Sequence, residues 1–325
     1  MSGTNREGTH LADGRAWLAL LKNERNFIAM LGIAFLAAGI FYDQPHIAMW
    51  IGFGVAAYSA IANDSIQTLG TFIASNKNTP WWQMWLFVGV IFLFTMGYSW
   101  VAYDGDVSHQ RLQAKGFETA PVAFEFLQVA APIFLLILTR LRMPVSTTFL
   151  LLSCFATSGK GFWAVASKSL NGYWIAFGVA IAFWFVLGPW MRKRFQGEAH
   201  RSWWAIQWLS AGFLWAVWLM QDAANIAVYL PRSLSTGQFV AFCSVIFFGL
   251  GFLMRMGGEK VQEVVDEKSG VTDVRSAAII NIIYGIILYI FKIVSKVPMS
   301  TTWVFIGLLA GRELAVAMRG CSTED

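Results

Sequence analysis

Two polar motifs recur in the same order along the chain, and each one interrupts a long apolar segment. The first motif is Asn63-Asp64-Ser65-Ile66-Gln67, and it returns as Gln221-Asp222-Ala223-Ala224-Asn225, with the two aspartates 158 positions apart. A Pro-x-Ser-Thr-Thr run follows each motif, first at 144–148 and then at 298–302, with an offset of 154. Two motifs repeated at nearly one offset predict an internal duplication, and in a membrane protein they place a binding site where the two copies meet.

The composition favours a membrane protein, because hydrophobic residues form 57% of the 325-residue chain and charged residues only 13%. A soluble protein carries about 25% charged residues, and a buried-helix soluble protein is the less favoured alternative. Lipid removes the need to hide so much apolar surface in one core. The expected fold is an all-α polytopic membrane protein with about ten transmembrane segments. The ten apolar runs are Phe27–Tyr42, Ile47–Ser75, Trp81–Tyr103, Val122–Leu138, Val145–Ala166, Tyr173–Trp190, Trp203–Leu230, Phe239–Met254, Ala277–Val294 and Val297–Met318.

Two of these runs, Ile47–Ser75 and Trp203–Leu230, are longer than a bilayer crossing needs, and they carry Asp64 and Asp222. A carboxylate at the centre of a membrane helix costs about 2.5–3.5 kcal/mol. We therefore expect each long run to be a broken helix that opens at its aspartate, with the freed backbone lining a polar cavity.

The distribution of basic residues predicts the orientation in the membrane. If the N-terminus is cytoplasmic and every run crosses, sixteen Lys and Arg residues fall inside and five fall outside, namely Arg111, Lys115, Lys168, Arg232 and Lys296. This bias predicts a multi-pass protein of the cell (inner or plasma) membrane with both termini in the cytoplasm. The basic residues occupy short turns rather than one face, so the net charge of +5 does not indicate a nucleic-acid partner.

The number of runs predicts the relation between the two copies. Each copy contains four runs, and one extra run separates them, so the second copy is inverted across the membrane plane. The expected organisation is a cytoplasmic segment at 1–26, a transmembrane region with the first repeat at 27–172, a linking helix at 173–192, the second repeat at 193–320 and a cytoplasmic tail at 321–325. The sequence leaves open whether the Ser-Thr-Thr segments cross fully or form re-entrant hairpins.

The repeated aspartates are the candidate cation ligands. A carboxylate is a hard oxygen ligand for Na⁺, or a proton carrier where burial disfavours its charge. Amides stand beside each aspartate and three residues after it, and their carbonyls can join a cation shell while their NH₂ groups donate to an anion. The candidate cation site is Asp64, Asp222, Asn63 and Asn225, with Na⁺ at the two aspartates, and Gln67 and Gln221 join the two asparagines as candidate substrate ligands.

The Pro-x-Ser-Thr-Thr runs predict helix starts, since Pro and Ser or Thr are favoured in the first turn. A single such run would be a helix cap and nothing more. Two symmetry-related helix starts that face one another would offer free N–H groups and hydroxyls to an anion. The candidate anion ligands are Ser146, Thr147, Thr148, Ser300, Thr301 and Thr302.

Together these motifs resemble the paired signatures of the inorganic phosphate transporter (PiT) family, a phosphate or sulfate permease family in which Asn-Asp-x-x-Asn and Pro-x-Ser-Thr-Thr elements recur in two inverted halves. The resemblance covers residues from about 45 to 318 and implies transport of phosphate, or of sulfate, coupled to Na⁺ or H⁺. It implies that the aspartates and asparagines build the cation and substrate sites and that the Ser-Thr-Thr hydroxyls contact the anion. The chain departs from the family pattern at Gln67, Gln221, Phe149 and Trp303.

The leading hypothesis is a secondary active symporter of a small inorganic oxyanion, with phosphate favoured over sulfate. A permease for another oxyanion and a passive anion channel are the alternatives, and an intramembrane enzyme acting on a lipid phosphate is less favoured. No Ser-His-Asp arrangement and no His or Cys ligand pair occurs in the sequence, so we expect no enzyme and no cofactor apart from co-transported Na⁺ or H⁺. The expected partners are the oxyanion and the lipid bilayer, and a homodimer is left open.

Overall fold

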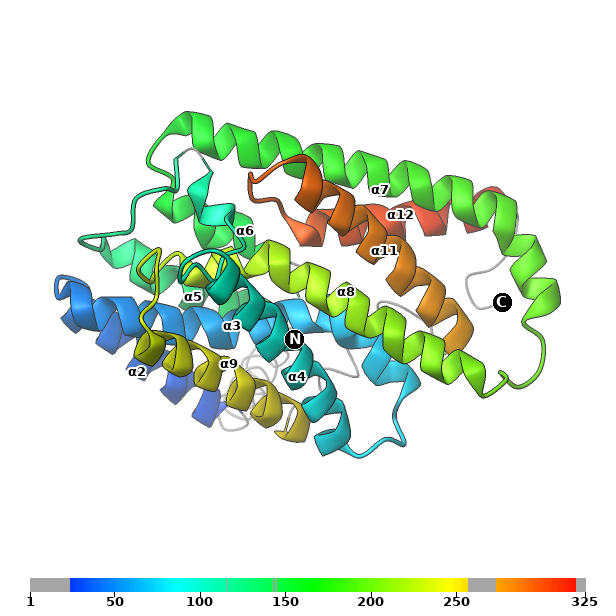
Figure 1. Cartoon of the computed structure of the whole chain (residues 1–325), viewed down its shortest axis with the longest axis horizontal. Helices are drawn as coiled ribbons and strands as arrows, with labels where there is room; N and C mark the ends of the chain where they lie inside the picture. The colour runs from blue at the N-terminus through cyan, green and yellow to red at the C-terminus, as the bar shows by residue number, and fades with distance from the viewer. Residues whose placement is uncertain (1–23, 115, 142, 144, 257–272, 320–325) are drawn as a thin grey trace, which may run out of the picture.

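A computed structural model describes residues 24–114, 116–141, 143, 145–256 and 273–319, although not the side chains of residues 64–67 and 192. This part of the chain folds into helices joined by loops and contains no strand (Figure 1). The α-helices are α2 (Arg25–Phe41), α3 (Pro45–Ser75), α4 (Trp81–Ala102), α5 (Phe126–Arg140), α6 (Thr147–Leu150), α7 (Gly159–Arg194), α8 (Ser202–Ala227), α9 (Thr236–Met256), α11 (Val274–Val294) and α12 (Thr301–Met318). Two 3₁₀ turns, η1 (Arg111–Gln113) and η2 (Leu152–Phe155), complete the set.

Six helices in the described part of the chain are long and apolar enough to cross a membrane. They are α3, α4, α7, α9, α11 and α12, while α2 and α5 are apolar but shorter. The protein is therefore an all-helical, multi-pass membrane protein, as its composition predicts. The expected total of about ten crossings and the inverted relation of the two repeats stay predictions.

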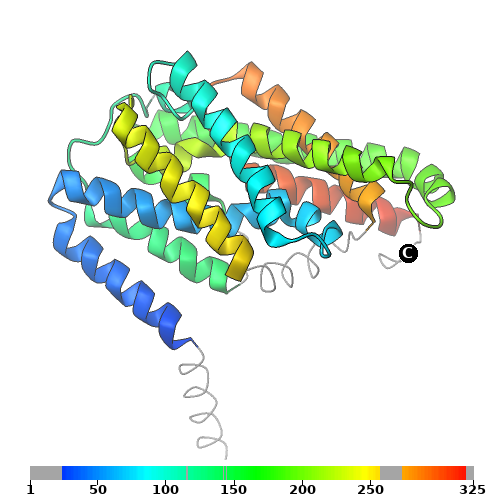
Figure 2. The same ribbon diagram turned by 60° about the horizontal axis from the view of Figure 1, so that its bottom comes forward.

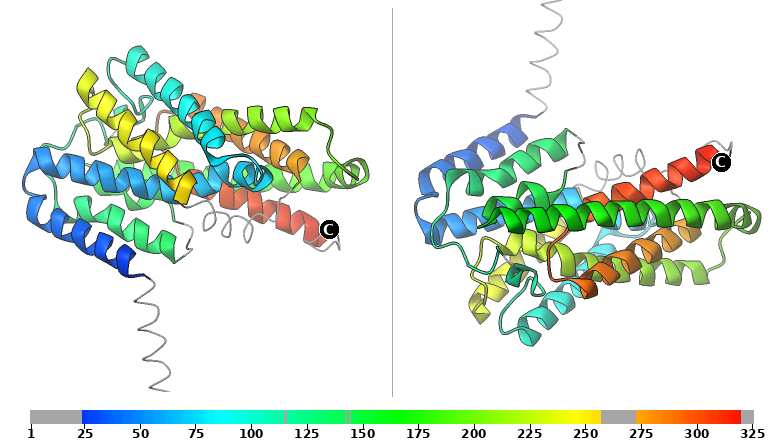
Figure 3. Two further views of the ribbon diagram at one scale, coloured as in Figure 1. Left: turned by 90° about the horizontal axis from the view of Figure 1, so that it is seen from below. Right: turned by 90° about the horizontal axis from the view of Figure 1, so that it is seen from above.

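The longest helix, α7, runs along most of the molecule and packs lengthwise against α12 (Figure 3, right). Two glycines one turn apart on α12 allow this close contact. A Cβ atom on Gly307 would lie 2.4 Å from the carbonyl oxygen of Tyr173, and one on Gly311 would lie 2.4 Å from that of Phe177. Membrane helices gain stability from such small-residue contacts, because lipid provides no hydrophobic drive for their association.

Helix α4 is held between α8 and α9 by indole hydrogen bonds to backbone carbonyls (Figure 2). Trp85 Nε1 of α4 donates to Phe247 O of α9 at 2.9 Å. Trp215 Nε1 of α8 donates to Val88 O of α4 at 3.0 Å. Both bonds give an indole N–H a partner within an otherwise apolar contact, which burial of that group requires.

The expectation of helices that open at the aspartates is wrong. Helix α3 continues without interruption past residue 64 to Ser75, and α8 continues through Asp222 to Ala227. At Asp222 the physical reason is visible, since neighbouring side chains supply the hydrogen bonds that the carboxylate needs and the helix need not unwind.

The chain breaks instead within the run expected at Val145–Ala166. This run consists of α6, η2 and the first turns of α7, with Ser158 capping the start of α7 through a hydrogen bond from Gly161 N. Helix α7 then continues to Arg194, so the run at 173–190 is the second half of a longer helix rather than a separate linking helix.

Helix α5 and the segment that returns from it form a hairpin. Thr157 N, near the end of the return, donates to Gly116 O at 3.0 Å, and Gln128 Nε2, near the start of α5, donates to Cys154 O at 3.0 Å. Both ends of the hairpin therefore lie at the loop between α4 and α5. Helix α5 has 15 residues, or about 22 Å of helix, against a hydrocarbon core of about 30 Å. These dimensions favour a re-entrant hairpin over two full crossings, and such a hairpin would lower the expected total of about ten crossings by two.

Candidate functional site

The two Pro-x-Ser-Thr-Thr runs begin helices, as their residues predict. Ser146 precedes α6 and Ser300 precedes α12. The Ser146 hydroxyl accepts a hydrogen bond from Phe149 N, and the Ser300 hydroxyl accepts one from Trp303 N, both at 3.3 Å. Each serine is thus a side-chain cap that occupies one of the free N–H groups of its first helical turn.

These two helix starts also contact each other in a reciprocal way. Thr148 Oγ1 donates to Met299 O at 3.2 Å, and Thr302 Oγ1 donates to Val145 O at 3.4 Å. The donors are 154 positions apart, and so are the acceptors. The rings of Phe149 and Trp303, again 154 apart, lie with their centroids 5.0 Å from each other. Reciprocal contacts between equivalent residues are what a local twofold relation produces.

A buried carboxylate joins both helix starts. Asn225 Nδ2 donates to Thr147 Oγ1 at 3.0 Å and to Asp222 Oδ1 at 2.9 Å. Thr301 Oγ1 donates to the other carboxylate oxygen, Asp222 Oδ2. Asp222 is 3% exposed and Asn225 is 1% exposed. The resulting chain of hydrogen bonds, Thr147–Asn225–Asp222–Thr301, is called here the bridging network.

The bridging network has free acceptor capacity for a cation. Within the described residues Asp222 forms no ion pair, and Asn225 Oδ1 has no hydrogen-bond partner there. A buried carboxylate outside an ion pair is costly, and a buried carbonyl oxygen without a partner calls for an explanation such as a bound ion. Carboxylate, amide and hydroxyl oxygens form a suitable shell for a small hard cation.

Asn63 lies at the edge of this network, whereas Gln221 contacts α11. Asn63 Nδ2 donates at 2.9 Å to Val145 O, the same carbonyl that accepts from Thr302. Gln221 Nε2 donates to Leu288 O of α11 at 2.9 Å, and its side chain makes no hydrogen bond to either helix start within the described residues. Asp64 and Gln67 have side chains outside the described part, so their predicted roles stay untested.

Three residues without a motif also shape the site. Tyr284 of α11 donates its hydroxyl to Thr301 O at 3.0 Å, Ser169 of α7 accepts from Ser300 N at 2.8 Å, and Thr139 of α5 donates to Asn63 Oδ1 at 3.5 Å. Each is a polar side chain within an apolar helix. Their polarity within an apolar segment is the only feature of the sequence that could have indicated these three residues, and many polar residues in apolar helices belong to no site.

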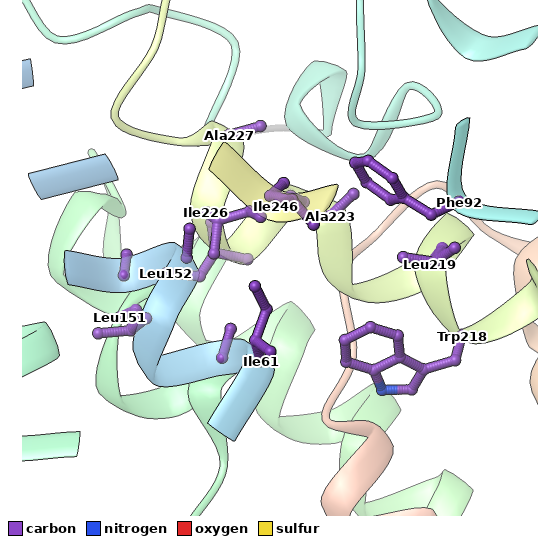
Figure 4. Close-up of a cluster of buried hydrophobic side chains, with 14 of the residues drawn as sticks. Ile61, Phe92, Leu151, Leu152, Trp218, Leu219, Ala223, Ile226, Ala227 and Ile246 are labelled. Carbon is purple, nitrogen blue, oxygen red and sulfur yellow. The ribbon is translucent and has the colours of Figure 1, made fainter. Parts of the chain in front are cut away.

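An apolar pocket lies on another side of the carboxylate. Its wall contains Asp222 together with Ile61, Phe92, Trp218 and Leu219. Figure 4 shows these four apolar side chains within the buried cluster between α3, α4, α8 and α9. The surroundings keep water away from that side of Asp222, which strengthens its electrostatic interactions.

Comparison with known proteins identifies the fold. No family model matches the sequence, and a search of curated proteins finds no match. A solved structure described as "The sodium-dependent phosphate transporter" superposes with a TM-score of 0.61 over 85% of this chain and 90% of that chain, at 16% sequence identity. The chain therefore has the fold of that transporter.

Proposed function

We propose that the protein is a secondary active symporter that carries a small inorganic oxyanion, phosphate before sulfate, together with Na⁺ or H⁺. The observation that carries this proposal is the bridging network, in which one buried carboxylate, Asp222, accepts a hydrogen bond from Thr301 at one Ser-Thr-Thr helix start and is linked through Asn225 to Thr147 at the other. The shared fold with a sodium-dependent phosphate transporter supports it.

The bridging network also suggests how cation and anion binding are coupled. In this structure the Thr301 hydroxyl directs its hydrogen to Asp222. A cation bound at Asp222 replaces that hydrogen, and the hydroxyl becomes free to donate to an anion at the start of α12. The free N–H groups and the positive end of the helix dipole at this start favour the same anion. One residue thereby makes anion binding dependent on the cation.

The energetics require such coupling. Moving a dianion against an inside-negative potential costs about 4–5 kcal/mol per 100 mV, from about 2.3 kcal/mol per charge. Two cations carried together with it cancel this electrical cost. Asp222 and its repeat counterpart Asp64 are the proposed ligands of the two cations, with Asn63, Asn225, Gln67 and Gln221 as supporting amides. The repeats are proposed to be inverted and to alternate around this site, with both termini cytoplasmic.

The decisive experiment is uptake into proteoliposomes that contain the purified protein. Labelled phosphate and labelled sulfate are each tested under a Na⁺ gradient, under a pH gradient and with no gradient. Accumulation above equilibrium under one imposed gradient supports the symporter and identifies its ion. Uptake that only equilibrates, whatever the gradient, identifies a passive anion channel and refutes the proposal. Release of product from lipid phosphate without uptake would identify an enzyme instead.

A further inference from the structure

The loop between α4 and α5 contributes a buried arginine to the interior of the molecule. Arg111 is 1% exposed. Its Nε donates to Met220 O at 3.4 Å, and its Nη1 donates to Ser295 O. Its Nη2 has no partner among the described residues. Burial lowers the pKa of Arg111 to about 10, opposed by the charge of Asp222, so the guanidinium stays protonated at neutral pH.

Two lysines place further positive charge beside this guanidinium. Lys168 of α7 donates to Ser295 O at 3.0 Å, so that the same carbonyl accepts from both Arg111 and Lys168. Lys292 lies in the last turn of α11, and the charges of both lysines interact with that of Arg111. No ion pair within the described residues neutralises any of the three. We name Arg111, Lys168 and Lys292 the cationic cluster.

The cationic cluster lies beside the segment that connects α11 to Thr301 in the candidate site. Lys168 and Lys292 are half-buried, whereas Arg111 is buried and is the cation whose charge acts on Asp222. The carbonyl held by Arg111 and Lys168 belongs to Ser295, at the beginning of the extended segment that leads to Thr301. Positive charge therefore extends from the partly exposed lysines towards the bridging network.

Arg232, which contacts the same loop, is a structural arginine with which Arg111 can be compared. All three guanidinium nitrogens of Arg232 donate to backbone carbonyls, including Nε to Phe117 O at 3.1 Å and Nη2 to Thr119 O at 2.9 Å. Arg111 instead keeps one buried nitrogen unused and stands among other cations. A guanidinium with a free nitrogen is suited to an oxyanion, since it donates charge-assisted hydrogen bonds in a fixed geometry.

We infer that the cationic cluster is a second oxyanion site, in which the anion binds Arg111 Nη2 and the two ammonium groups before it passes to the bridging network. The inference rests on the proposed function for the identity of the anion as phosphate or sulfate. It also accounts for two lysines beside a buried guanidinium, none of them in an ion pair among the described residues, because a dianion supplies negative charge to all three.

The test measures oxyanion uptake by Arg111→Gln and Lys168→Gln in proteoliposomes, with Arg232→Gln as the matched control. The cluster variants are expected to raise the KM for the oxyanion by about tenfold or more, as loss of a charge-assisted hydrogen bond predicts, and to weaken the dependence of uptake on ionic strength. Arg111→Lys should recover part of the affinity. Arg232→Gln should lower the thermal stability but change the KM by less than about twofold, because its bonds go only to carbonyls. Lys168→Gln leaves the hydrogen bonds of Arg111 in place, so this variant still tests the cationic cluster if Arg111→Gln does not fold.

A direct binding measurement separates this inference from the proposed function. Binding of labelled inorganic phosphate and of sulfate to the purified protein is compared for the wild type and the cluster variants. If the wild type transports neither anion yet binds one in an Arg111-dependent way, the symporter is refuted and the second site stands. If the wild type transports and the cluster variants keep its KM and its binding, or change no more than Arg232→Gln, the second site is refuted.

Discussion

Replacing Asp222 by asparagine should abolish coupled uptake without destabilising the fold. The carboxylate accepts one hydrogen bond from Asn225 and one from Thr301. An asparagine can direct its oxygen to the Asn225 amide and its NH₂ to the Thr301 hydroxyl, which accepts as well as donates. Both contacts survive as neutral hydrogen bonds, so the packing of the two helix starts is preserved.

The magnitudes favour this separation of stability from function. A hydrogen bond to a charged group contributes about 1.5–3 kcal/mol and a neutral one about 0.5–1.5 kcal/mol, so two bonds lose about 2–3 kcal/mol together. Removing the buried charge of Asp222 recovers a desolvation penalty of several kcal/mol. We expect unchanged or increased stability in Asp222→Asn. A cation loses its only charged ligand among the described network residues, and a loss of about 2.7 kcal/mol already corresponds to a hundredfold lower affinity.

Two measurements on three proteins test this reasoning. Thermal unfolding is followed by tryptophan fluorescence, and gradient-driven uptake is followed in proteoliposomes, for the wild type, Asp222→Asn and Asp222→Leu. Leucine offers no acceptor, so two buried donors lose their partner, at about 1–3 kcal/mol each, and this variant should unfold earlier. Wild-type accumulation by Asp222→Asn would refute the cation-ligand role. Equal destabilisation by asparagine and leucine would refute the hydrogen-bond argument.

Three further outcomes are expected. Thr147→Val and Thr301→Val, which remove the hydroxyls of the bridging network, should each raise the KM for the oxyanion by about tenfold; unchanged KM values in both would exclude a role for these hydroxyls. Gly311→Ala places a Cβ 2.4 Å from the Phe177 carbonyl and should destabilise the protein by about 1–3 kcal/mol in thermal unfolding, whereas Gly54→Ala, with open space at its Cβ, should not. Burial lowers the pKa of His109 from 6.5 to about 3. Between these two pH values the imidazole is protonated in the unfolded chain but neutral in the folded one, so the free energy of unfolding should fall as the pH decreases from about 6.5 towards 3. His109→Gln should weaken this dependence of stability on pH, and an unchanged dependence would show that other groups cause it.

The sequence predicts well those features that follow from local patterns. Apolar runs without charge became helices, so that the run expected at Trp81–Tyr103 is α4 at Trp81–Ala102. The Ser-Thr-Thr runs began helices because their serines cap them in a purely local way. The recurrence of the Ser-Thr-Thr run predicted two helix starts that face one another, and in the structure Thr148 of one start donates to Met299 O and Thr302 of the other donates to Val145 O.

Features that depend on distant partners could not be predicted. The aspartates suggested broken helices, because nothing in the sequence shows that Thr301 donates to Asp222 and stabilises it within an intact helix. In the sequence, Arg111 and Lys168 contribute only to the charge bias that predicts the orientation, because nothing in it shows that both donate to the carbonyl of Ser295. Asp222 and Gln221 are adjacent in sequence, yet one contacts the helix starts and the other contacts α11.

The glycine contacts between α7 and α12 limit how this protein can change shape. Gly307 and Gly311 lie so close to the backbone of Tyr173 and Phe177 that any rotation or shift which brings a residue with a Cβ to either place meets those carbonyls. We therefore expect the two helices to move together, so that a rearrangement which opens the interior bends the short connection ahead of Thr301 or separates α12 from Asp222.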